Sequence, residues 1–338
     1  MKNSINKNKT AKPVSVTFIV LCVVLIAYAA LIIFMLLWGL NTSLKSSGEF
    51  GFLENYMGFP TLDKNAQESS YEAFFHLANY RTVIQKFKYM NVFTYYRGSE
   101  AVTRSTKTLF GYLVGAQNSL DLRYAYFPDM ILNTVIYVGC AALVSSVIPA
   151  LTAYLTAKYD FKLSGIIFVL YTLMMCMPIV GNQPAQLAFL QKTGLYDTMV
   201  GIILQWASGA GLYYFVFYAY FKSVPETYRE AASIDGAGEC TVMFKIYFPL
   251  AIKMISTVFL IMFVSLWNDY QTPMIFMPTK PTLAFGVFYF SSMSGDVAFY
   301  NDPTKIAANM ILALPILVLF IIFKNRLMGD ISLGGIKE

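Results

Sequence analysis

The sequence predicts an all-helical (all-α) membrane protein with six transmembrane helices. Hydrophobic residues make up 57% of the chain and charged residues only 13%, whereas soluble domains carry about 25% charged residues. The apolar residues gather in separate runs near the length of about 20 residues that a helix needs to cross a bilayer. Almost no charged side chains interrupt these runs. Together, these observations exclude an ordinary soluble domain.

The first apolar run, 14–40, follows a polar and basic segment, 1–13, that carries four lysines. A basic start before an apolar stretch is also typical of signal peptides. This stretch is too long for a signal core, and no small-residue cleavage pattern follows it. We therefore expect residues 1–40 to form the N-terminus and a retained first membrane helix.

A long polar segment with many aromatic residues, 41–127, separates this helix from the second. It is too long for a simple loop and has no run of membrane length, so we expect it to have structure of its own. Apolar residues near helical spacing between 68 and 93 predict a surface helix. The only histidine, His76, lies there, and one histidine alone makes no metal site. The segment is either a contact surface for another protein or a packed cap.

Residues 128–338 are expected to form a core of five further helices, at about 130–156, 164–180, 199–221, 251–267 and 303–323. Pro178 and Pro184 bracket an interruption, where irregular backbone must be covered by protein or by a water-filled cavity. Met177, Asn182 and Gln183 are therefore candidates for lining a translocation pathway. The alternative is that they are kink and helix-end residues packed against a neighbouring helix.

Trp267, Asn268 and Asp269 close the fifth predicted helix. An indole can stack on a sugar ring, and an amide and a carboxylate can hydrogen-bond hydroxyl groups. These three residues are therefore further candidates for a translocation pathway, at its outer rim. Alternatively, Trp267 is an interfacial anchor at a polar helix end.

The charged segment between the fourth and fifth helices, 222–250, predicts two short helices joined by a glycine turn. Pro225 suits a first helical position, and Gly236 stands where a C-terminal cap takes a positive φ. Apolar residues from Val242 to Tyr247 at helical spacing predict the second helix, which Pro249 is expected to end. A small capped hairpin of this kind is typical of a docking element on a membrane domain.

Glu230-Ala231-Ala232, Gly236, Ile246 and Pro249 resemble the EAA motif of permease subunits of binding-protein-dependent ATP-binding cassette importers. One position departs from the motif, because Phe248 stands where the pattern has Leu. Further stretches resemble the MalG-like, carbohydrate-uptake branch of this family. They are Asn79-Tyr80-Arg81, Thr193–Thr198, Val224-Pro225, Ile234–Ala237 and Trp267-Asn268-Asp269.

The resemblance implies a type I importer permease fold with a cytoplasmic coupling helix and an enlarged extracytoplasmic segment between helices 1 and 2. It implies three kinds of protein partner: a second permease subunit, two ATP-binding cassette ATPase subunits and an extracytoplasmic solute-binding protein. ATP and magnesium would be bound by the ATPases, and this chain would bind no cofactor and no metal of its own. The ATPase-docking residues would be Arg229, Glu230, Ala231, Ala232, Asp235 and Gly236.

Charge asymmetry predicts the orientation in the membrane. Six helices place both termini on one side, and loops on the cytoplasmic side of a membrane carry the excess of Lys and Arg. Placing the N-terminus inside gives thirteen Lys and Arg to the inner segments and three to the two short outer loops. We therefore expect both termini and the segment 222–250 in the cytoplasm, in the cell membrane of a bacterium as the resemblance implies.

The sequence lacks the residues that several classes of function require. The sequence has no Gly-x-x-x-x-Gly-Lys-Ser/Thr phosphate loop and no acid–base or His/Cys cluster, so we expect a transport subunit rather than an enzyme. The net charge of +6 sits in membrane-flanking segments and does not indicate nucleic acid. Helices without charges disfavour ion-coupled transport. A secondary transporter, or a membrane scaffold or receptor not driven by ATP, are the alternatives.

Overall fold

The computed structural model describes residues 15–51, 55–60, 77–90, 92–97, 100–105, 124–176, 181–209, 211–292 and 302–329. Contacts divide the chain into two compact units, Met1–Tyr80 with Asn301–Met310 and Arg81–Tyr300 with Ile311–Glu338. The division at Tyr80 falls inside the segment 41–127 that the sequence predicts as one insertion. His76 lies outside the described residues.

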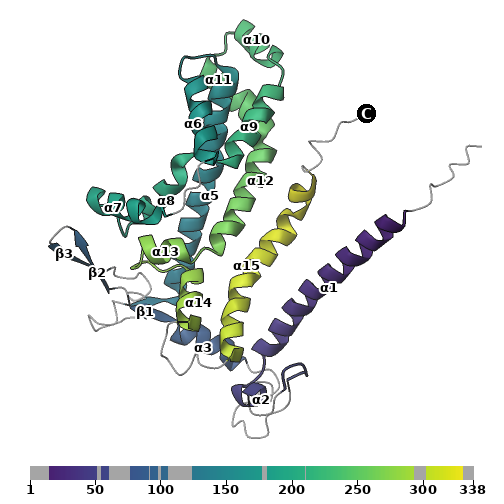
Figure 1. Cartoon of the computed structure of the whole chain (residues 1–338), viewed down its shortest axis with the longest axis vertical. Coiled ribbons are helices and arrows are strands. Elements are labelled where there is room, and N and C mark those ends of the chain that lie inside the picture. The colour runs from purple at the N-terminus through teal and green to yellow at the C-terminus, as the bar shows by residue number, and fades with distance from the viewer. Residues whose placement is uncertain are drawn as a thin grey trace, which may run out of the picture. The chain divides into compact units, whose positions relative to one another are not determined.

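The described part of the chain is mostly helical (Figure 1). Its first helices and strands are α1 (Val16–Ser43), α2 (Ser47–Gly51), α3 (Ala78–Lys86), β1 (Lys88–Met90), β2 (Val92–Arg97), β3 (Glu100–Ser105) and β4 (Tyr124–Tyr126). The helices that follow are α5 (Phe127–Lys158), α6 (Ser164–Cys176), α7 (Gln183–Thr193), α8 (Met199–Gln205), α9 (Leu212–Ser223), α10 (Thr227–Ile234), α11 (Glu239–Val242), α12 (Phe248–Trp267), α13 (Gln271–Phe276), α14 (Leu283–Ser292) and α15 (Asp302–Gly329).

Four helices among the described residues are long and apolar enough to cross a membrane, namely Val16–Ser43, Phe127–Lys158, Glu239–Trp267 and Asp302–Phe323. A fifth candidate is the pair Met199–Ser208 and Leu212–Ser223, which is bent by 52°. The predicted helix 164–180 appears as α6, whose 13 residues end at Cys176. Residues 177–180, which include Met177, lie outside the described part of the chain.

The expectation of an all-helical chain is wrong, because the described residues between 88 and 126 form strands. Of the helix expected over 68–93, the described part, which starts at residue 77, is helical only over Ala78–Lys86. β1 pairs with β4 and β2 with β3, both antiparallel. β-branched and aromatic residues dominate β2, and such residues favour strands. The hydroxyls of Thr94 and Thr103, which face each other across the β2–β3 pair, lie 2.9 Å apart.

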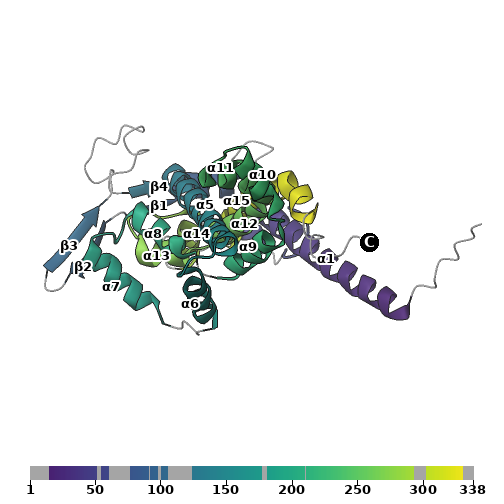
Figure 2. The ribbon, with the colours of Figure 1, turned by 90° about the horizontal axis from the view of Figure 1, so that it is seen from above.

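The second unit is built around α5, which packs along α9 and α12 (Figures 1 and 2). Small side chains of α5 allow the close approach, because Ala141, Ala142, Ala150 and Ala153 are all fully buried. The hairpin of α10 and α11 lies at one end of these helices, and α13 and α14 lie at the other (Figure 1). The structure thus places the charged segment and the Trp267 segment at opposite ends of the same helices.

The fourth predicted helix, 199–221, is not continuous. α8 passes into a 3-10 turn, Trp206–Ser208, and α9 begins only at Leu212. Gly209 has φ +66° and Gly211 has φ +140°, conformations that L side chains rarely adopt, so the glycines permit the break. The apolar run 199–221 carries no signal of this positive φ and therefore predicts one continuous helix.

In the first unit, Asn79 fastens the end of α1. Its amide nitrogen donates to the carbonyl oxygens of Ser43 (2.9 Å), the last residue of that helix, and of Lys45 (2.8 Å), two residues further on. Its amide oxygen accepts from the hydroxyl of Thr304 (3.1 Å), in the first turn of α15. The neighbouring Tyr80 hydroxyl lies 2.7 Å from the hydroxyl of Ser43. These bonds give the Asn-Tyr pair of the predicted Asn79-Tyr80-Arg81 motif a structural role.

Replacing Asn79 with Leu keeps the size of this buried side chain but removes all three hydrogen bonds. We expect the free energy of unfolding to fall by about 1–3 kcal/mol, because buried carbonyl groups lose their donor. Thermal denaturation of the purified protein in detergent would measure the loss. As a control, Asn309→Leu alters an exposed side chain that donates to the carbonyl of Lys305 in its own helix, and it should shift stability little. Equal shifts in both variants would contradict the assigned role.

Candidate functional site

The segment 222–250 forms a helical hairpin, as the sequence predicts. α10 begins at Thr227, two residues later than the predicted start at Pro225, and ends at Ile234. Gly236 then has φ +76°. Its N–H donates to the carbonyl of Ser233 (3.1 Å), and the N–H of Ala237 donates to the carbonyl of Ala232 (2.9 Å). These two bonds make a complete Schellman motif, which explains why glycine suits this position.

The second arm of the hairpin does not end where the sequence predicts. Pro249 was expected to terminate it, but α11 continues through a π-helical turn, Met243–Tyr247, directly into α12. Pro249 has no N–H to give to the carbonyl of Lys245 and its ring crowds that carbonyl. The chain widens instead, and the N–H of Phe248 bonds to the carbonyl of Met243. The hairpin is therefore joined to a membrane helix without an intervening loop.

The inner face of the hairpin packs on the ends of the membrane helices. Ala232, Val242 and Tyr247 are buried in one cluster with Tyr154 of α5 and Phe221 of α9. The ring of Tyr154 lies 5.1 Å from that of Tyr247 and 5.4 Å from that of Phe221, between centroids. Because interlocked aromatic rings resist sliding, the hairpin is seated firmly on α5 and α9.

A polar network reinforces this seat. The ammonium of Lys158, at the end of α5, donates to the carbonyl of Val224 (2.6 Å) and to the carboxylate of Glu226 (3.3 Å). Arg229 also pairs with Glu226 and lies 3.8 Å from the carboxylate of Glu239. The Lys158 side chain is only 5% exposed, so its charge is shielded from water and depends on these partners.

Protonation states support the same network. Burial alone would raise the pKa of Glu226, but hydrogen bonds from Arg229 and Lys158, together with their charges, hold that pKa below its ordinary value. Glu226 therefore stays ionised at neutral pH. Its contribution to stability begins to fall below the ordinary carboxyl pKa and is lost as the pH falls through the lowered pKa. Burial and the hydrogen bond to Glu239 raise the pKa of Tyr159, so that hydroxyl remains a donor.

The outer face of the hairpin is free of such contacts. Ile234, at the tip, is 87% exposed, and Tyr228 is also exposed. Between and beside them, Glu230, Ala231 and Asp235 are exposed too. Apolar side chains next to two carboxylates on a projecting tip can pack against a partner and form charge-assisted hydrogen bonds with it.

The six predicted docking residues thus separate into two groups. Glu230, Ala231, Asp235 and Gly236 lie at the exposed face or tip. Ala232 instead packs inward, and the Arg229 guanidinium pairs with carboxylates of its own hairpin. Lys158 and Tyr154, which hold the hairpin on α5, are not among the predicted site residues. In the sequence, Lys158 is a basic residue near a predicted helix end and Glu226 is an acid at the start of the hairpin. No rule of sequence spacing pairs two residues that lie this far apart in the chain.

The predicted pathway residues are not brought together. Asn182 and Gln183 are exposed at the start of α7, and Met177 is outside the described residues. Trp267 is 5% exposed, donates from its indole to the carbonyl of Leu312 (3.0 Å) and stacks on Phe263. Its burial agrees better with an anchoring role than with a sugar-facing surface.

Asn268 and Asp269 also turn to the protein. The Asn268 amide donates to the carbonyl of Val264 one turn back (3.0 Å). The Asp269 carboxylate accepts from the hydroxyl of Tyr137 on α5 (3.2 Å) and from the N–H of Thr272 (3.0 Å). Asp269 therefore fixes the junction of α5, α12 and α13. Within the described residues, no group of three His, Cys, Asp or Glu side chains could hold a metal ion.

Comparison with known proteins gives a family and several relatives. The sequence pattern described as "Binding-protein-dependent transport system inner membrane component" matches residues 145–328. The melibiose/raffinose/stachyose import permease protein MelC of Bacillus subtilis (strain 168) is 30% identical over 220 residues, which are 63% of this chain and 77% of that protein. The diacetylchitobiose uptake system permease protein NgcG of Streptomyces coelicolor is 29% identical over 207 residues, which are 61% of this chain and 68% of that protein.

A solved structure supports the fold. The crystal structure of a bacterial ABC transporter involved in the import of the acidic polysaccharide alginate contains a chain that matches with a TM-score of 0.62. The match covers 90% of this chain and 94% of that one, at 16% sequence identity. At this identity the likeness establishes a shared fold and nothing about substrate.

Two glycines of the hairpin offer a test of the turn. A Cβ at Gly236 or at Gly238 would meet no atom within 4 Å, but only Gly236 has a positive φ. Gly236→Ala should therefore destabilise the turn by about 1–2 kcal/mol through backbone strain alone. Hydrogen exchange of the Gly236–Gly238 region would accelerate accordingly. Gly238→Ala should leave exchange unchanged, and equal acceleration in both variants would contradict the Schellman turn.

Proposed function

The chain belongs to the family of binding-protein-dependent transport system inner membrane components, and we propose that its hairpin is the element through which a separate ATPase drives transport. The chain is the multi-pass, inner-membrane permease component of an ABC importer, and such a component is not itself an enzyme. It carries no cofactor, and ATP is bound by the partner ATPase.

One observation carries the proposal: the hairpin has an exposed tip and a rigid seat. The tip offers Tyr228, Ile234 and two carboxylates to a partner. The seat is the cluster of Ala232, Val242 and Tyr247 on α5 and α9. An element that transmits motion from another protein needs an exposed surface for that protein and rigid packing on the membrane helices. If the packing were flexible, the hairpin would move without moving the helices.

The direction of transmission follows from the connections. The hairpin enters from α9 and leaves through the π-helical turn into α12, and Lys158 ties its first residues to α5. When ATP binding brings the two ATPase subunits together, each hairpin moves with the ATPase on which it sits. α5, α9 and α12 then tilt as a body between inward-open and outward-open states.

The contacts at the tip have distinct roles in this proposal. Glu230 pairs with a basic group of the ATPase, while Ala231 permits close approach and Asp235 adds a second carboxylate. Ala232 supports the tip from inside. Gly236 holds the turn, and Arg229 keeps α10 in place by pairing within the hairpin.

The proposed assembly is a heterodimer of this chain with a second permease subunit, together with two ATPases and an external solute-binding protein. The four long helices and the bent α8–α9 pair are up to five candidate spans. The proposal takes the shorter apolar helix α6 as the sixth. The excess of Lys and Arg on one set of segments then places both termini and the hairpin in the cytoplasm. Residues 41–127 form the extracytoplasmic insertion between helices 1 and 2, where they can contact the binding protein or the second permease.

The solute is a carbohydrate or oligosaccharide. The support for this class comes from relatives whose names specify import of melibiose, raffinose and stachyose, of diacetylchitobiose, and of trehalose. The scarcity of charged residues in the predicted membrane runs favours a neutral solute, because a charged one would require a counter-charge in the membrane.

Reversing the charge of Glu230 tests the docking role. In the complete importer reconstituted in vesicles, Glu230→Lys should abolish uptake coupled to ATP hydrolysis, because the carboxylate meets a basic group on the ATPase. The variant should still insert, since Glu230 is exposed and supports no packing. Uptake of labelled saccharide and phosphate release, measured on the same vesicles, would separate coupling from hydrolysis.

Asp160→Lys provides a matched control. Asp160 is an exposed acid on the loop between α5 and α6, outside the hairpin, so the same reversal there should leave the ratio of uptake to hydrolysis unchanged. Normal coupling in Glu230→Lys, or equal uncoupling in Asp160→Lys, would count against the hairpin as the specific point of entry.

A further inference from the structure

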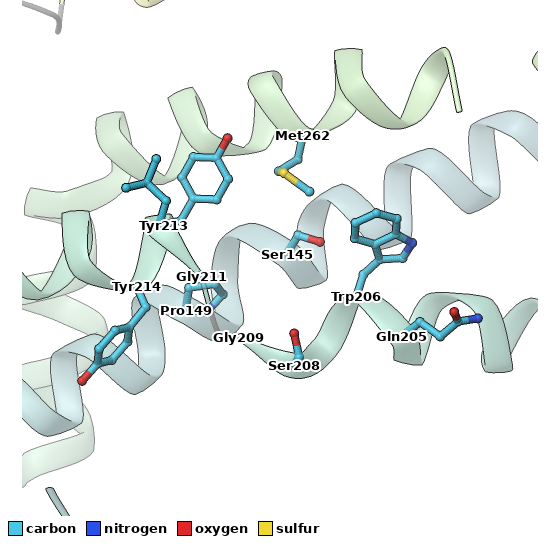
Figure 3. Close-up of a pocket in the computed structure, with 11 residues that line it drawn as sticks. Ser145, Pro149, Gln205, Trp206, Ser208, Gly209, Gly211, Tyr213, Tyr214 and Met262 are labelled. Carbon is cyan, nitrogen blue, oxygen red and sulfur yellow. The ribbon is translucent and has the colours of Figure 1, made fainter. Parts of the chain in front are cut away.

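A pocket of about 300 Å³ opens beside the break between α8 and α9 (Figure 3). Its walls come from α5 (Ser145, Pro149), from the break itself (Gln205, Trp206, Ser208, Gly209) and from Met262 of α12. The break lies within the bent pair of helices that counts as one candidate membrane span. None of the described residues that line the pocket is charged.

Two backbone features create this space. Gly209 approaches α5 closely, since an added Cβ would lie 3.0 Å from Cγ2 of Ile148 and 3.2 Å from the Tyr171 hydroxyl. On the facing helix, Pro149 has no N–H to donate to the carbonyl of Ser145, four residues earlier. Irregular backbone on both sides is stable within a membrane only where protein or a polar cavity covers it.

Two buried polar atoms beside the pocket have no partner among the described residues, namely Oγ of Ser145 and Nε2 of Gln205. Ser145 is 6% exposed and lies on the wall formed by α5. Leaving such groups unpaired costs about 1–3 kcal/mol each. Such a cost is offset when a bound ligand hydrogen-bonds these groups. The hydroxyl groups of a ligand can both donate and accept hydrogen bonds, so they suit both atoms.

Hydrogen bonds hold the side chain of Trp206, at the break, in place beside the pocket. The indole N–H of Trp206 donates to the Tyr137 hydroxyl (3.2 Å), and Tyr137 donates to Asp269 (3.2 Å). These two hydrogen bonds fix the Trp206 ring, which lies close to Ser145 and Met262 in Figure 3. Apolar ring faces next to unpaired polar atoms suit a ring-shaped ligand with both C–H faces and hydroxyl groups.

We propose that this chain itself carries a site for a neutral saccharide at the break between α8 and α9, an inference that rests on the proposed function. Trp206 contacts the C–H face of a sugar ring, while Ser145 and Gln205 hydrogen-bond its hydroxyl groups. Asp269 and Tyr137 are positioning residues that hold the Trp206 indole. The lining without charges disfavours an anionic or cationic solute, and a lipid chain would leave Ser145 and Gln205 unpaired.

Protection from thiol labelling tests the site in the complete importer. The four native cysteines are first replaced, and Ser208→Cys is introduced at an exposed pocket residue. Ser223→Cys, also exposed but at the far end of α9, is the control. The probe is whichever of melibiose, raffinose, trehalose and diacetylchitobiose the wild-type importer takes up in vesicles.

The saturating saccharide should slow labelling of Ser208→Cys about tenfold, as expected for about 90% occupancy, and leave Ser223→Cys unchanged. Unprotected Ser208→Cys, or equal protection of both cysteines, would overturn the pocket while leaving the hairpin proposal intact. Protection by added lipid instead of saccharide would also overturn it. If the wild-type importer takes up none of these saccharides, the proposal that the solute is a carbohydrate is wrong. The proposal of a saccharide site in the pocket then fails as well.

A second variant pair separates binding from structural damage. Gln205→Leu keeps the side-chain size but removes the hydrogen bond, so uptake of the probe should fall about tenfold at low saccharide concentration. Gln191→Leu makes the same replacement on α7, outside the pocket, and should not alter uptake. Equal losses in both variants would contradict a ligand role for Gln205.

Discussion

A buried ammonium group, that of Lys158, joins the end of one membrane helix to the start of the hairpin. It donates to the carbonyl of Val224 and to the carboxylate of Glu226, and it lies 5.1 Å from the centroid of the Tyr247 ring. A shielded charge cannot leave its partners without a large loss of hydration or pairing energy. The hairpin and α5 therefore move together, and the rest of the functional account depends on this constraint.

The second unit contains two irregular stretches of helix, one beside the hairpin and one beside the pocket. The π-helical turn, Met243–Tyr247, lies where the hairpin meets α12. The break at Trp206–Gly211 interrupts the fourth membrane segment beside the pocket. π-helical turns often occur at functional sites, and glycines with positive φ let the backbone bend without loss of covering contacts. In the proposed mechanism, motion that enters at the hairpin reaches α5 and α12, two helices that line the pocket.

Much of this arrangement could be predicted from the sequence. Membrane-length apolar runs and the charged segment with its glycine are local patterns, and the structure confirms long helices, the hairpin and the positive φ of Gly236. The breaks could not be predicted in the same way. Gly209 and Gly211 occur in an apolar run that is otherwise suited to a helix, and glycine serves close helix packing as often as it serves a bend. Only the positive φ of the two glycines in the folded chain decides between the two.

Roles that depend on distant partners were also beyond the sequence. Trp267 and Asp269 stand side by side in a polar motif, yet the first is buried against Phe263 and the second bonds Tyr137, 132 residues away. Ala231 and Ala232 are identical neighbours, but only Ala232 is buried. The strands after α3 were missed because their aromatic residues also fit helical spacing over a short window.

Site-specific photocrosslinking at Ile234 tests the central claim most directly. Ile234 is the most exposed apolar residue at the hairpin tip, at 87%, and a photoreactive side chain placed there in the intact importer will react with whatever covers it. The account predicts an adduct with the ATPase subunit, whereas the same label at Leu173, an exposed apolar residue of α6, should not give one. Labelling of lipid, of the external binding protein or of nothing at Ile234 would contradict it.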